Sequence, residues 1–138
     1  LLNELDKSID INFTYNNDQI LLISDSEQLS RVFLNLIKNS IESIQEKFLN
    51  KPNLKGKIDI EIHNKENYLE FFIVDNGMGF NNLKNKIKDI LNPYFTTKIK
   101  GTGLGLAIVN KIINDHNGTI DFESLDDGAK IIIKFDKL

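Results

Sequence analysis

The sequence predicts a single α+β domain with a long irregular segment in its middle. Two stretches space their apolar residues as helices do, and several short stretches alternate apolar and polar residues as half-buried strands do. The 138 residues contain no repeat and no linker long enough to divide the chain, so the predicted domain spans 1–138. A chain of this length can bury one hydrophobic core.

The N-terminal part is predicted to hold two strands and the longer helix. Residues 9–23 are interpreted as two short strands separated by a turn at 16–18, which has the sequence Asn-Asn-Asp. The helix follows and begins at a capping box formed by Ser24 and Glu27. Its apolar residues recur at helical spacing, at Leu29, Val32, Phe33, Leu36, Ile37, Ile41 and Ile44.

The C-terminal part is predicted to supply the rest of the sheet and a second helix. Residues 58–62 alternate isoleucine with charged residues, whereas 68–74 is largely apolar on both faces, as a central strand would be. The second helix is expected over 106–115, opened by a glycine. The strands 119–124 and 129–135 then form a hairpin over an Asp-Asp-Gly turn.

Composition excludes several classes of protein. With 41% hydrophobic and 27% charged residues the chain is no disordered tail, and no apolar run reaches the ~18 residues of a membrane helix. With a net charge of −3 and a pI of about 5.4, the chain lacks the excess of basic residues that is typical of a nucleic-acid binder. The absence of cysteine allows a reducing, cytoplasmic setting. The chain opens without methionine or a signal peptide, and we expect it to be a fragment of a longer protein.

Two asparagines on the longer predicted helix are candidate metal ligands. Asn35 and Asn39 are four residues apart and therefore share a helix face. The simplest interpretation is that they are polar residues facing solvent. However, an asparagine carbonyl is also a neutral oxygen ligand of the kind that suits Mg²⁺, which keeps waters and substrate phosphates around it.

Two glycine-containing segments flank the irregular middle. Residues 75–79, Asp-Asn-Gly-Met-Gly, follow the predicted central strand, and a hairpin turn there would require a strand that 81–91 does not provide. A carboxylate beside glycines instead suits recognition of an exocyclic amine on a flat ring. Residues 101–105, Gly-Thr-Gly-Leu-Gly, lead into a helix N-terminus, where free N–H groups favour phosphate.

The order of four motifs is what identifies the family. NLIKNSIES on a helix, DNGMGF after a strand, NPYFTTK and GTGLGLAIV together resemble the ATP-binding domain of sensor histidine kinases over essentially the whole chain. The resemblance implies a two-layer α+β sandwich, the Bergerat fold. This fold has a mixed, mainly antiparallel five-stranded sheet packed on three helices, with an ATP lid between the central strand and the helix after the last glycines. Glu42, Ser43 and the short lid are most similar to the nitrogen-regulation subgroup.

The resemblance also implies roles for single residues. Asp75 would accept a hydrogen bond from the adenine amino group, and Gly77 and Gly79 would let the ring approach. Asn39, with Asn35 one turn earlier, would hold Mg²⁺ against the phosphates of ATP. The other implied ATP-binding residues are Lys38, Phe95, Thr96, Thr97, Lys98, Gly101, Thr102, Gly103, Leu104, Gly105 and Leu106, with Lys100 as a further phosphate partner.

Neither histidine is expected to accept phosphate. His63 lies on an alternating strand and His116 at a helix end, and neither has the neighbours of a phosphoacceptor helix. The resemblance therefore implies an acceptor histidine upstream, on a dimerisation helix domain of the same protein, and a response regulator downstream. We expect no nucleic-acid partner and no direct membrane contact by this domain, which would be cytoplasmic even if the inner membrane anchors its parent protein.

Two other functions remain open. ATP-hydrolysing relatives in the gyrase, mismatch-repair and heat-shock chaperone families carry a general-base glutamate where this chain has Asn35, and an amide cannot activate water as a carboxylate can. Phosphoryl transfer to a protein acceptor is therefore favoured over hydrolysis. An anti-sigma-type serine kinase or binding module would share most of the same motifs.

Overall fold

The computed structural model describes residues 9–15, 26–49, 51, 55–79 and 105–137. Several predictions fall outside these ranges. They include the second N-terminal strand, the capping residue Ser24 and the lid.

The sheet has five strands in the order β1-β2-β3-β5-β4. These are β1 (Ile9–Tyr15), β2 (Gly56–Asn64), β3 (Tyr68–Asp75), β5 (Gly128–Asp136) and β4 (Gly118–Leu125). The edge strand β1 is parallel to β2, and the other three pairs are antiparallel. The predicted mixed, mainly antiparallel sheet is confirmed, and the strand expected to be central is the middle one.

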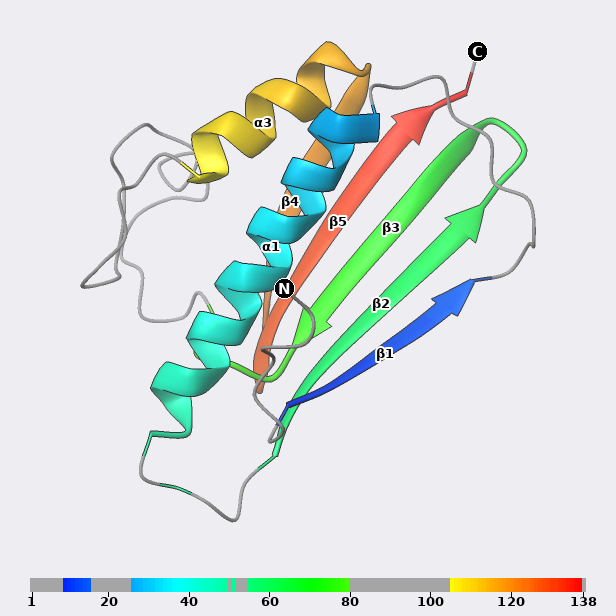
Figure 1. The fold of residues 1–138 in the computed structure, drawn as a ribbon. Helices are drawn as coiled ribbons and strands as arrows, with labels where there is room; N and C mark the ends of the chain where they lie inside the picture. Colours follow the sequence, from blue (N-terminus) through cyan, green and yellow to red (C-terminus); the bar gives the residue numbers. More distant parts are fainter. Residues whose placement is uncertain (1–8, 16–25, 50, 52–54, 80–104, 138) are drawn as a thin grey trace.

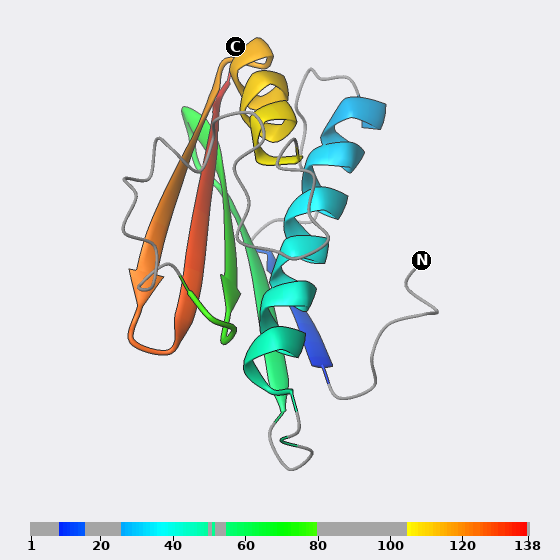
Figure 2. The same cartoon turned by 90° about the vertical axis from the view of Figure 1, so that its left-hand side faces the viewer.

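Two helices are present in the described part of the chain, and both lie against the same face of the sheet (Figure 1). The long α1 (Ser26–Lys47) packs on β2 and β3, while α3 (Gly105–Asp115) packs on β4 and on α1. Figure 2 shows the resulting two layers from the side. The two-layer sandwich is thus confirmed, whereas the third helix stays a prediction. Neither helix combines the length and the apolar composition needed to cross a membrane.

The core lies between the two layers and follows the alternation of the strands. On β3 the inward side chains at 69, 71 and 73 are buried, and they meet the apolar stripe of α1. The Phe71 ring packs against Phe33 of α1 and Phe135 of β5, with centroids 4.9 and 5.9 Å apart. The next inward position of β3 is 75, where the chain places an aspartate instead of an apolar residue.

The opposite face of the sheet carries no helix in the described part, and charged side chains lie over its aromatic rings. There Lys130 lies over the Phe72 ring at 4.2 Å and Lys134 over the Tyr68 ring at 4.6 Å. His63 also lies on this face, with its ring 5.0 Å from that of Phe72. The prediction that His63 is a polar-face residue of a strand is therefore confirmed.

Candidate nucleotide-binding site

The side chain of Asp75 is the centre of the candidate site. It is the last residue of β3, it points toward α1, and only 5% of its surface is exposed. Ser40 of α1 donates a hydrogen bond from Oγ to Asp75 Oδ2 over 2.9 Å, and the backbone N–H of Gly77 donates to Oδ1 over 2.9 Å. Each carboxylate oxygen thus has a protein donor, and the carboxylate keeps acceptor capacity for a ligand.

The pKa of Asp75 lies above its ordinary value of 3.8, mainly because burial disfavours the charged form. Four groups oppose that effect and lower the pKa: the N–H of Gly77, the hydroxyl of Ser40, the N–H of Ala129 and the charge of Lys47. A carboxylate held in this way, away from water, is a strong acceptor for an N–H donor.

The loop after Asp75 is fastened to α1. Met78 donates its backbone N–H to Ser43 Oγ over 2.8 Å. A side chain at Gly77 would come within 2.9 Å of Ser43 Cβ and 3.0 Å of the backbone nitrogen of Ile44. Gly77 is therefore required by its packing against α1, which is a separate reason from the ring approach implied by the resemblance. That approach, at Gly77 and Gly79, stays a prediction.

Asn76 fastens the same loop to β2. Its Oδ1 accepts the backbone N–H of Lys57 over 2.7 Å, and its Nδ2 donates to the carbonyl of Lys55 over 3.1 Å. The backbone N–H of Asn76 also donates to the Lys57 carbonyl. The side chain thus extends the pairing between β2 and β3 by one step beyond the end of β3.

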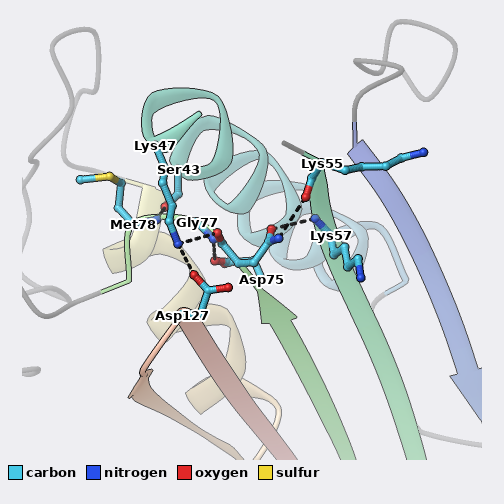
Figure 3. A network of polar contacts seen from close by, with 9 residues as sticks. Ser43, Lys47, Lys55, Lys57, Asp75, Gly77, Met78 and Asp127 are labelled. Carbon is cyan, nitrogen blue, oxygen red and sulfur yellow. Dashed lines mark hydrogen bonds and ion pairs between the residues drawn. The ribbon is translucent and has the colours of Figure 1, made fainter. Parts of the chain in front are cut away.

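Lys47, near the end of α1, joins three elements (Figure 3). Its Nζ donates to the carbonyl of Asn76 over 3.1 Å and forms an ion pair with Asp127 in the turn between β4 and β5. The hairpin passes so close to β3 that a side chain at Gly128 would come within 2.8 Å of Asn76 Cα, and Gly128 has a φ of 126°. Glycine is therefore needed at 128, both because there is no room for a side chain and because φ is positive.

The two candidate metal ligands lie farther along α1, toward its N-terminus. Asn35 donates from Nδ2 to the carbonyl of Arg31 over 3.0 Å. Its Oδ1 lies beside the start of α3, because a Cβ atom added at Gly105 would be 3.4 Å from this oxygen. An amide oxygen next to a helix N-terminus suits magnesium and phosphate together, and Asn39 shares that helix face. These residues therefore fit an ATP–Mg²⁺ complex.

The remaining predicted site residues divide into two groups. Lys38 is exposed on α1, and Leu106 is half-buried and packs on the core. The others lie outside the described residues: Phe95, Thr96, Thr97, Lys98, Lys100, Gly101, Thr102, Gly103 and Leu104.

Sequence reasoning did not single out Ser40, Lys47 or Asp127 as parts of the site. One signal was available for Ser40, because it stands at helical spacing between Leu36 and Ile44, both of which are core residues. A hydroxyl inside an apolar stripe requires a buried hydrogen-bond partner. The contacts of Lys47 and Asp127 had no local signal, since these residues are 80 positions apart.

Known proteins with similar sequences include bacterial kinases. A protein of Rickettsia prowazekii (strain Madrid E) named as an NtrY-like sensor histidine kinase is 38% identical over 127 residues, which cover 90% of this chain and 20% of that protein. Sporulation kinase A of Bacillus subtilis (strain 168) is 37% identical over 115 residues, covering 83% of this chain and 17% of that kinase. The chain spans roughly a fifth of the length of these curated relatives.

Solved structures agree with the sequence comparison. The catalytic domain of histidine kinase ThkA, in a nucleotide-free form, matches with a TM-score of 0.78 and 30% identity over 94% of this chain and 80% of that one. The mycobacterial sensor histidine kinase MprB, at 22% identity, shares the fold with a TM-score of 0.72 over 94% of this chain and 82% of that one. Residues 24–138 match the family of histidine kinase-, DNA gyrase B- and HSP90-like ATPases, and the chain belongs to that family.

Proposed function

We propose that this domain binds ATP–Mg²⁺ and donates the γ-phosphoryl group to a histidine on a separate dimerisation helix domain. It would be the catalytic half of a two-component sensor histidine kinase. The observation that carries the proposal is the buried Asp75 carboxylate at the end of the central strand, held by Ser40 and by the backbone of Gly77. Membership of the ATPase family and the similarity to sensor histidine kinases support the same assignment.

The proposed division of labour follows the position of each residue. Asp75 would accept a hydrogen bond from the exocyclic amine of adenine, and Asn35, whose Oδ1 lies beside the start of α3, would hold the metal ion together with Asn39. Magnesium, when bound, neutralises charge on the phosphates during phosphoryl transfer. The described residues thus bind and orient the nucleotide, whereas the acceptor comes from outside this domain.

Transfer to protein is favoured over hydrolysis because of the side chain at position 35. Hydrolytic relatives need a carboxylate there as a general base, and the Asn35 amide cannot take a proton from water in that way. The amide group donates instead to the Arg31 carbonyl of its own helix.

We further propose a response regulator as the downstream partner and a cytoplasmic location. ThkA has been solved in complex with the response regulator protein TrrA, and this chain matches 35% of that ThkA chain with a TM-score of 0.71. Assignment to the nitrogen-regulation subgroup is supported by the similarity to NtrY-like kinases.

The test is a phosphotransfer assay with labelled ATP. The 138-residue chain should neither label itself nor release phosphate at an appreciable rate when alone. Mixed with the acceptor-helix dimer of a relative, it should place acid-labile phosphate on the histidine of that dimer. Acid-labile phosphate on His63 or His116 of the lone chain would contradict the proposal, and acid-stable phosphate on a partner serine would favour an anti-sigma-type kinase instead.

A further inference from the structure

We infer that Ser40 is a positioning residue for base recognition: its hydroxyl holds the Asp75 carboxylate in the orientation that accepts the exocyclic amine of adenine. The inference rests on the proposed function and deepens it. Ser40 is not among the ATP-binding residues that the resemblance implies, and the inference gives it a part in selecting the base.

A serine at position 40 destabilises the fold unless its hydroxyl forms a hydrogen bond. The residue is 2% exposed and lies between Leu36 and Ile44, which are 0% and 2% exposed, on the buried stripe of α1. Serine is a weaker helix former than alanine, and a hydroxyl without a partner would be penalised in this environment. The bond from Ser40 Oγ to Asp75 Oδ2, at 2.9 Å, removes that penalty.

The orientation of the carboxylate depends on donors from different elements. Gly77, in the loop after β3, donates to Oδ1, and Ser40, on α1, donates to Oδ2. Donors on both oxygens fix the carboxylate plane, so the acceptor capacity that remains for a ligand has a set direction. Without Ser40, the carboxylate would lose the donor that α1 supplies and would be held only by the backbone N–H groups of Gly77 and Ala129.

The charge of Asp75 depends on the same hydroxyl. Burial raises the pKa of Asp75, and the Ser40 hydroxyl is one of the groups that lower it. Removal of the hydroxyl therefore raises the pKa further, and ATP binding, which needs the ionised form, fails at a higher pH. The other groups that face this carboxyl are the backbone N–H groups of Gly77 and Ala129, Lys47 of α1 and, through its ion pair with Lys47, Asp127.

The experiment compares Ser40→Ala with Ser30→Ala in the 138-residue chain. Ser30 is on the same helix but exposed, so the control makes the same change in helix propensity away from the site. Each variant is titrated calorimetrically with ATP and with purine riboside triphosphate, which lacks the exocyclic amine, at pH values from 7.5 down to about 4.5. The titration of the phosphates themselves cancels in the ratio of variant to parent affinity.

We expect Ser40→Ala to weaken ATP binding about tenfold at neutral pH, the size of one hydrogen bond to a charged group. Binding of the analogue without the amine should change less than twofold. The pH at which half of the ATP affinity is lost should rise in Ser40→Ala and stay unchanged in Ser30→Ala. Ser40→Cys fills the site with a slightly larger atom that is a weak donor, so it should behave like Ser40→Ala and covers the case in which the alanine variant does not fold.

Equal weakening of both nucleotides, or an acid midpoint that does not move, would overturn the role of Ser40. ATP binding by Ser40→Cys that equals the parent at low pH would overturn it as well. These results differ from a failure of the proposed function, in which Asp75→Asn itself would bind ATP as tightly as the parent chain does.

Discussion

The two halves of α1 face the candidate site in different ways. In the C-terminal half, polar side chains reach other elements: Ser40 bonds to Asp75 of β3, and Lys47 bonds to the loop after β3 and to the β4–β5 turn. In the N-terminal half, Asn35 bonds back to the carbonyl of Arg31 in its own helix. From Ser40 onward the helix is joined to the sheet by side-chain hydrogen bonds, whereas Asn35 and Asn39, which precede Ser40, carry amides suited to a metal ion.

The difference indicates which part of the site is built before the nucleotide arrives. The groups that we propose to recognise the base are held by hydrogen bonds that also join α1, β2, β3 and the β4–β5 turn, so they are fixed by the fold itself. The groups that would hold the metal gain their remaining ligands from the phosphates and from water. Substitutions that break these contacts at the base end should therefore alter both stability and binding, and substitutions at the metal end should act mainly on binding.

The largest contrast should come from the same substitution at two glycines. Gly77→Ala forces a methyl group against Ser43 and the backbone of α1, and should lower the free energy of unfolding by about 2–3 kcal/mol. Gly105→Ala meets only ordinary contact, 3.4 Å from Asn35 Oδ1, at the first residue of α3, and should change it by less than about 1 kcal/mol. Urea denaturation of both variants measures this. Equal destabilisation by the two would show that the halves of the site do not differ as argued.

A smaller effect, confined to the metal end, is expected for Asn39→Ala. The extra ATP affinity contributed by Mg²⁺ should fall about tenfold, whereas binding in the presence of a chelator should stay within about twofold of the parent, because the base end is untouched. Titrations with and without Mg²⁺ separate the two quantities. If metal-free binding falls as much, Asn39 has a structural role and not the one proposed.

The smallest effect is a pH dependence of folding due to Asp75. Its pKa in the folded state is above the unfolded value of 3.8, so burial of the charged form costs stability at neutral pH. As the pH falls through the folded pKa toward 3.8, the parent chain should gain stability relative to Asp75→Asn, which cannot titrate. A difference of one pH unit between the two pKa values corresponds to about 1.4 kcal/mol. Thermal unfolding of both proteins between pH 7 and about 4 tests this. A loss of stability of the parent chain relative to Asp75→Asn as the pH falls would contradict the prediction.

Much of the fold could be predicted because its signals are local. The alternation in 58–62 and the helical spacing from Leu29 to Ile44 each arise within one element, and each was found in its expected place. The inward position of Asp75 also follows from alternation, since Leu69, Phe71 and Ile73 lead to it. These signals need no knowledge of how distant segments meet.

The ion pair and hydrogen bonds that hold the site in place could not be predicted, because they depend on tertiary structure. Lys47 and Asp127 are far apart in sequence and meet only when the end of α1 lies against the β4–β5 turn. The sequence analysis assigned no contact to the Asn76 side chain, which bonds to the backbone of Lys55 and Lys57 beside the start of β2. A single sequence contains no periodicity that reports such contacts.

The central claim is that Asp75 recognises adenine, and a calorimetric titration of ATP–Mg²⁺ into the parent chain and Asp75→Asn tests it most directly. Asparagine keeps the shape and can still bond to Ser40 and Gly77, so the variant should unfold no more readily than the parent at pH 7. Its ATP affinity should fall about 10- to 100-fold, because a hydrogen bond to a charged acceptor is replaced by an amide that presents donors as well. An unchanged ATP affinity in the folded variant would remove Asp75 from the adenine site and contradict the account.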